Sequence, residues 1–158
     1  MVELLLVRHA DAGDPLAWPG PDADRPLSRK GRNQAERLAA LLARVRSAPD
    51  ALVSSPKARA EQTASILGSA LGLDVHLHEG LASPLTLASL ATILADSGEP
   101  HRPILVGHDP DLSDLASELV GAAVALKKGA LARIDLAGPP VAGEGVLRWL
   151  VPPELYGR

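Results

Sequence analysis

The 158-residue sequence contains no cysteine and no phenylalanine, and aromatic side chains make up only 2% of it. Without cysteine the chain has no disulfide, no thiolate zinc site and no cysteine nucleophile. Without phenylalanine the core must be packed from aliphatic side chains, and platforms on which nucleic-acid bases stack are almost missing. The net charge of −3 also argues against a general nucleic-acid-binding protein.

Long apolar runs are missing as well. No stretch approaches the length of a membrane-spanning helix, and the first residues, Met1–Glu3, lack the basic cluster that begins a signal peptide. We therefore expect a cytoplasmic protein with no membrane contact. The length, with 46% hydrophobic and 22% charged residues, predicts a single domain over residues 1–158.

The hydrophobic pattern predicts strands that alternate with helices. Strands are expected at 2–7, 51–54, 74–77, 103–107, 130–136 and 146–151, and helices at 28–46, 55–72, 83–98 and 109–121. The last two strands have no helix between them, which favours an antiparallel edge. This order predicts an α/β fold in three layers, with a mainly parallel central sheet of about six strands and helices on both faces.

Histidines follow two of the predicted buried strands. Arg8 and His9 end the first strand, and His108 follows the strand at 103–107. Open α/β sheets bind ligands at the carboxyl ends of their strands, so both imidazoles are expected to face one crevice. An arginine beside a histidine there indicates an anion and a group that can attack or protonate it. Two core histidines held by backbone groups are the alternative.

Basic residues lie where helix dipoles disfavour them. Lys57 and Arg59 open the second predicted helix, and the first predicted helix begins with Arg29, Lys30 and Arg32. A bound anion would remove the conflict, because helix N-termini and arginines both favour phosphate. A solvated basic surface is the other explanation, and we favour it for the first helix.

The segment 11–27 fits no regular element, because it is rich in proline, glycine and aspartate. A structureless loop of this length is often functional. Here it directly follows Arg8 and His9, and a tolerated surface excursion is the alternative. Trp18 is expected to hold the loop against the body of the domain.

Four segments together resemble the histidine phosphatase superfamily, which has the phosphoglycerate-mutase-like fold. They are 6–10 (LVRHA), 24–28 (DRPLS) with Gly31, 54–56 (SSP) with Arg59 and 62–64 (QTA), and 106–108 (VGH). These segments occur in the family order. Within the family, the compact length and the Arg-Pro-Leu-Ser sequence most resemble the SixA-type protein phosphohistidine phosphatases.

The resemblance implies a phosphatase that needs no metal and no cofactor and acts on phosphohistidine in a protein partner. By position, His9 would be the nucleophile that takes the phosphoryl group, and Arg8, Arg59 and His108 would complete the phosphate pocket. This agrees with the chemistry, because a neutral imidazole can attack phosphorus and two guanidiniums can neutralise the transferring group. Water would then release phosphate from His9.

The chain also departs from the family pattern. Members commonly continue the opening motif as Arg-His-Gly-Glu-Thr, whereas this chain has Arg-His-Ala-Asp-Ala. Mutases and many phosphomonoesterases of the family add an acidic proton donor, for which Glu79 is the candidate here and a surface position the alternative. A phosphatase of small phosphomonoesters and a phosphate-binding regulatory module without turnover therefore stay open as functions.

Other charged residues are weaker candidates for the site. Asp24 would orient part of the phosphate pocket. Lys127 and Lys128 precede the strand at 130–136 and would approach the site from there, although we favour a solvated turn for them. The remaining histidines, His76, His78 and His101, are interpreted as surface residues.

Overall fold

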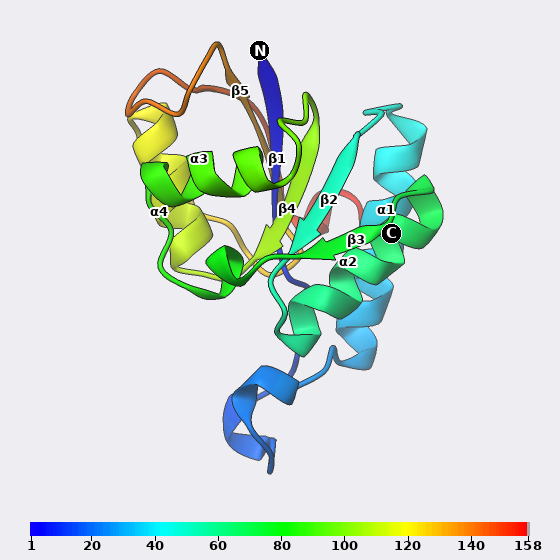
Figure 1. Ribbon diagram of the computed structural model, residues 1–158. Coiled ribbons are helices and arrows are strands. Elements are labelled where there is room, and N and C mark those ends of the chain that lie inside the picture. The colour runs from blue at the N-terminus through cyan, green and yellow to red at the C-terminus, as the bar shows by residue number, and fades with distance from the viewer. Residues whose placement is uncertain (158) are drawn as a thin grey trace.

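A six-stranded sheet forms the centre of the computed structural model, which describes residues 1–157 (Figure 1). The strands are β1 (Val2–Arg8), β2 (Ala51–Ser54), β3 (Val75–Leu77), β4 (Pro103–Gly107), β5 (Leu131–Leu136) and β6 (Val146–Val151). Their order is β3-β2-β4-β1-β5-β6, with the first four parallel and the last two forming an antiparallel edge. The predicted mainly parallel α/β sheet is confirmed.

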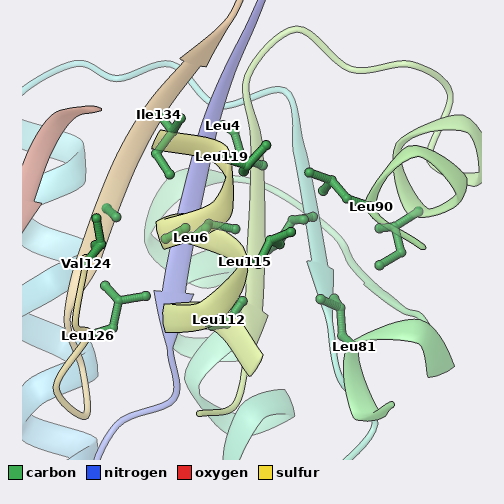
Figure 2. Packing of buried hydrophobic residues seen from close by; sticks show 14 of the residues in the cluster. Leu4, Leu6, Leu81, Leu90, Leu112, Leu115, Leu119, Val124, Leu126 and Ile134 are labelled. Atoms are coloured by element: carbon green, nitrogen blue, oxygen red, sulfur yellow. The ribbon is translucent and has the colours of Figure 1, made fainter. Parts of the chain in front are cut away.

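Four helices cover the two faces of this sheet: α1 (Arg29–Arg44), α2 (Ala58–Leu71), α3 (Leu87–Asp96) and α4 (Asp111–Val120). The helices α1 and α2 share one apolar core with Leu5, Leu52 and Ile104 of the strands. The helices α3 and α4 share the other core, where the leucines of α4 lie over Leu4 and Leu6 of β1 (Figure 2). Among the described residues, no helix has the length and apolar character needed to cross a bilayer.

Strand β1 is buried on both faces and polar at both ends. The side chains of Leu4–Val7 alternate between the two cores, and each is at most 2% exposed. At the start of the strand, the Glu3 carboxylate lies 2.7 Å from Arg102 Nε and 3.2 Å from Arg133 Nη2. At its end, Arg8 donates a hydrogen bond from Nη1 to a backbone carbonyl outside the sheet. An apolar run of this kind is typical of an interior parallel strand.

Two helices begin later than the Ser-Pro pairs that predict them. Helix α2 begins at Ala58, and Ser55 still continues the pairing of β2 with β4 by donating its backbone N–H to the Val106 carbonyl. Helix α3 begins after Thr86, which forms a capping box with Ser89 and so supplies a stronger start signal than the preceding Ser-Pro pair. In both cases tertiary or local hydrogen bonds override the simpler sequence signal.

The loop 11–28 protrudes from the body of the protein (Figure 1) and contains two short 3₁₀ turns, η1 (Pro15–Ala17) and η2 (Asp22–Asp24). Arg25 holds the loop together from within, since its buried guanidinium donates 2.8 Å to the Ala12 carbonyl and 3.1 Å to the Asp22 carboxylate. Trp18, which we expected to hold the loop against the body, instead donates its Nε1–H to the Pro21 carbonyl within the loop. The loop is joined to the body by α2, where Arg59 donates to the Asp22 carbonyl and carboxylate and Gln62 accepts the backbone N–H of Leu27.

Candidate active site

The carboxyl ends of β1 and β4 lie side by side at one edge of the sheet. The two strands are parallel neighbours, with Arg8 in register with Gly107, and the residues that follow them are His9 and His108. The centroids of the two imidazole rings are 5.2 Å apart, and both side chains are buried. The structure thus brings together two histidines that lie about a hundred residues apart in the sequence.

The hydrogen bond of His9 defines which ring nitrogen carries the proton. Its Nδ1 lies 2.7 Å from the Ala10 carbonyl oxygen, which can only accept a hydrogen bond. Nδ1 is therefore the protonated nitrogen of the neutral ring, and the lone pair is on Nε2. This tautomer leaves Nε2 as a nucleophile.

His108 is oriented by Ser55, which follows β2 and is fully buried. The Ser55 hydroxyl oxygen lies 2.7 Å from His108 Nε2 and accepts the backbone N–H of Lys57 at 3.2 Å. Within residues 1–157, His108 Nε2 is the hydrogen-bond acceptor within reach of the Ser55 hydroxyl, so Ser55 is the donor and Nε2 the acceptor of this bond. Nδ1 of His108 therefore carries the ring proton and is a hydrogen-bond donor.

Two arginines complete this edge of the sheet. Arg59, in the first turn of α2, is 6% exposed and donates from Nη1 to the Asp22 carbonyl at 2.9 Å and from Nη2 to the Asp22 carboxylate at 3.0 Å. Arg8, at the end of β1, donates from Nη1 to the Leu126 carbonyl at 2.9 Å and lies 3.6 Å from the Asp109 carboxylate. Both guanidiniums are held through their terminal nitrogens.

Three buried side-chain nitrogens within residues 1–157 have no hydrogen-bond partner: Arg8 Nε, Arg59 Nε and His108 Nδ1. Leaving a buried donor unsatisfied costs about 1–3 kcal/mol, so such groups are rare in native proteins. All three are donors, and all three belong to residues that the sequence predicts for phosphate binding. Their arrangement suits an oxyanion, which accepts several hydrogen bonds and carries the charge that two arginines favour.

Burial and neighbouring cations keep both histidines neutral. Burial lowers the pKa of His9 from 6.5 to about 4, with repulsion from Arg59 and Arg8 acting in the same direction and the Ala10 hydrogen bond opposing it. Burial also lowers the pKa of His108 to about 3, assisted by the repulsion that a protonated His9 would exert and by the charge of Arg59. At pH 7 His9 therefore presents an uncharged Nε2 lone pair in a pocket whose charge comes from arginines.

These pKa shifts predict a specific loss of stability in acid. Because the folded-state pKa of each histidine lies below its unfolded value near 6.5, the unfolded chain binds more protons as the pH falls. The contribution is complete above about pH 6.5 and is lost as the pH falls toward about 4 for His9 and about 3 for His108. Urea unfolding at pH 7 and at pH 5 should show a large loss for the wild type and a smaller one for the double variant His9→Asn/His108→Asn. An equal loss in both proteins would contradict the assignment.

Acidic residues contact the arginines, but they are not the ones that the sequence analysis proposed. Glu79, in the 3₁₀ turn η3 (Glu79–Ala82), is exposed, and its carboxylate makes no hydrogen bond or ion pair within residues 1–157; the same holds for Asp24. Asp22 and Asp109 are the carboxylates beside Arg59 and Arg8. A hydrogen bond from Arg25 and the charge of Arg59 lower the pKa of Asp22, so it is ionised at neutral pH.

The sequence did not predict Asp22 or Asp109 as site residues, and only Asp109 had a signal in the sequence. Asp109 directly follows the second predicted histidine, but we interpreted it only as the start of a helix. Asp22 lies in the proline-rich loop, and only the fold brings it against α2. Among residues 1–157, no group of three or more histidine, aspartate or glutamate side chains is arranged to hold a metal ion.

Solved structures of similar shape define the class of this fold. A crystal structure from Agrobacterium tumefaciens, described as a candidate phosphohistidine phosphatase SixA, matches with a TM-score of 0.80 and 26% identity, covering 96% of this chain and 99% of that one. A tungstate complex of the protein histidine phosphatase SixA matches with a TM-score of 0.82 and 24% identity, covering 98% of this chain and 99% of that one. The fold is that of the phosphoglycerate-mutase-like α/β proteins.

The sequence comparisons identify the family. The model of the histidine phosphatase superfamily (branch 1) matches residues 4–83. An uncharacterized protein from Picosynechococcus sp. is 33% identical over 121 residues, which cover 75% of this chain and 73% of that protein. The chain belongs to the histidine phosphatase superfamily and is SixA-like within it. Membership of this family supports a phosphatase activity.

Proposed function

We propose that this protein is a metal-independent phosphatase that removes the phosphoryl group from phosphohistidine in a protein partner, through a phosphoryl intermediate on His9. The observation that carries this proposal is the set of three unpartnered buried donors, on Arg8, Arg59 and His108, beside an imidazole with a free lone pair. The similarity to SixA proteins supports the choice of phosphohistidine as substrate.

The proposed reaction has two transfers. In the first, the phosphorylated imidazole of the substrate takes a proton from solvent on its free ring nitrogen, the His9 Nε2 lone pair forms a bond to phosphorus, and the bond from phosphorus to the substrate breaks, so that a neutral imidazole leaves. In the second, water forms the new bond to phosphorus and the bond to His9 Nε2 breaks, which restores neutral His9. Inorganic phosphate leaves, and one proton of the attacking water goes to solvent, which balances the proton taken up in the first step.

The arginines and His108 stabilise the charge of the transferring group. Phosphoryl transfer depends mainly on positioning and charge neutralisation, which fixed guanidiniums supply in a buried site. Among the described residues, no carboxylate of the pocket is an evident proton donor: Asp22 is ionised, Asp109 accepts two hydrogen bonds from Ser113 beside Arg8, and Glu79 lies exposed outside the contacts of the site. This favours a phosphoramidate, because imidazole is a far better leaving group than an alkoxide, which needs an acid as its bond breaks.

Parallel turnover of a phosphohistidine protein and a panel of alkyl phosphates, in the presence of a chelator, tests the proposal. We expect turnover of phosphohistidine at least about 10²-fold faster, unaffected by the chelator and by Glu79→Gln. Efficient turnover of alkyl phosphates that Glu79→Gln lowers by about 10²–10⁴-fold would identify a small-molecule phosphatase instead. Phosphate binding without turnover of any substrate would identify a regulatory module.

A further inference from the structure

A groove of about 990 Å³ lies beside the phosphate site and reaches it at Arg8. Its basic lining residues are Arg8, Arg29, Lys30, Arg37, Lys127 and Lys128, against two acidic ones among residues 1–157, Asp11 and Glu154. The whole chain carries a net charge of −3, so the sign of the groove is opposite to that of the molecule. A concentration of positive charge of this kind attracts a negatively charged partner to one place and in one orientation.

Helix α1 forms one wall of the groove, and its first turn packs directly against the segment that follows His9. A Cβ at position 31 would lie 1.9 Å from the Asp11 carbonyl oxygen, so only glycine permits this approach. Ser28 donates 2.6 Å to the Asp11 carboxylate and accepts the Gly31 N–H, and Gln34 accepts the Asp11 N–H at 2.9 Å. Since Asp11 follows His9 by two residues, the position of α1 relative to the phosphate site is fixed by direct contacts.

The basic residues of α1 form a stripe along one face of the helix. Arg29 and Arg37 are eight residues apart and Lys30 and Arg37 seven apart, which are spacings that repeat on one helix face. At 1.5 Å per residue the stripe is about 12 Å long. Lys127 and Lys128 face it from the turn before β5. The groove therefore presents charge over a length that exceeds a single phosphate group.

Half of these cations have no acidic partner in the part of the chain that the structure describes. Lys127 lies 3.1 Å from Glu154 and Lys128 3.6 Å from Asp11, so these two pairs account for both carboxylates of the groove. Within residues 1–157, the three basic side chains of the α1 stripe have no carboxylate within 4 Å. Two of them also lie at the positive end of the helix dipole, where an anion is favoured and a cation is not.

We infer that this groove docks an acidic surface that flanks the phosphohistidine of a protein substrate, an inference that rests on the proposed function. A small organic ligand fits the groove poorly, because such ligands bind mainly apolar and aromatic walls, and the side chains here are almost all charged or amide groups. Exposed lysines and arginines spread over 12 Å instead match several carboxylates on a protein surface, which they attract and orient.

Two phosphohistidine peptides of equal length, one flanked by glutamates and the other by glutamines, test this inference. At low ionic strength, the wild type should show a kcat/KM about tenfold higher for the glutamate peptide, through KM rather than kcat, and the preference should shrink as salt is added. The double variant Lys30→Glu/Arg37→Glu should lose the preference. The matched control Arg32→Glu/Arg44→Glu changes two exposed arginines of the same helix outside the groove and should keep it.

Equal turnover of the two peptides by the wild type, or loss of the preference in both double variants, would overturn the inference. A preference for small bisphosphates without a preference for glutamate would also overturn it, because the groove would then bind a second phosphate. The proposed function fails separately, if neither peptide nor phosphoramidate is hydrolysed. In that case, the fluorescence anisotropy of a labelled, unphosphorylated glutamate peptide measures binding directly. Binding that Lys30→Glu/Arg37→Glu abolishes and the control variant keeps would support the inference, and absence of binding to the wild type would overturn it.

Discussion

His9→Ala is expected to lower phosphohistidine turnover by about 10⁴-fold or more, because it removes the atom that forms the bond to phosphorus. The remaining donors would still bind phosphate, so the variant should retain affinity for inorganic phosphate or vanadate. In the wild type, a rapid quench with labelled phosphoramidate should trap an acid-labile, base-stable label on the peptide that contains His9. Both turnover and labelling should be absent in His9→Ala.

The exposed His76 provides a matched control for this experiment. His76→Ala removes an imidazole of equal size from the surface and should leave turnover and labelling unchanged. Circular dichroism of both variants separates a chemical effect from unfolding. A phosphoryl label of the same stability on the His9→Ala protein would show that another group takes the phosphoryl, and the assignment of His9 would be wrong.

Arg59→Ala is expected to lower kcat/KM by about 10²–10³-fold, the usual cost of removing one fixed donor to developing negative charge. Arg59→Lys should recover only part of this loss, because an ammonium restores the charge but not the guanidinium donors. Inhibition by vanadate should weaken in both variants. Little stability should be lost, since the partner of Arg59 in the fold, Asp22, has a side chain that is 55% exposed and can be hydrated.

Arg32→Ala, which removes an exposed arginine outside the site, is the control and should change neither kcat/KM nor vanadate inhibition. If Arg59→Ala lost thermal stability in step with its loss of activity, the role of Arg59 would be to hold the loop 11–28 in place and not to bind phosphate. Full activity of Arg59→Lys would mean that charge alone suffices at this position.

The sequence predicted the backbone of the site well, because its signals are local. Short buried runs mark β1 and β4, and the parallel arrangement of alternating strands and helices then places His9 and His108 at one edge of the sheet. The misplaced starts of α2 and α3 show the limit of the same signals. At α2 the backbone of Ser55 remains paired with β4, and at α3 the capping box of Thr86 and Ser89 supplies the start instead of the Ser-Pro pair.

The partners within the site could not be read from the sequence, because they depend on contacts between distant segments. Asp22 meets Arg59 only after the loop 11–28 has folded onto Arg25, and Ser55 meets His108 only in the completed sheet. The role of the basic residues of α1 likewise depends on a contact between distant segments. In the sequence they indicate only a solvated helix face, whereas in the structure the turn at 127–128 lies opposite them and the two segments form a groove.

The burial of β1 on both faces has a consequence for the register of the strand. In a strand with one buried face, a slip of one residue would expose the core, and the hydrophobic effect resists it. In β1 such a slip would only exchange apolar side chains between the two cores, so the apolar pattern alone specifies the alignment weakly. The polar residues at the ends of the strand specify the register, because Glu3 forms its ion pairs with Arg102 and Arg133 in one alignment only. Glu3, about 20 Å from His9 along the strand, thereby helps to determine where His9 emerges from the sheet.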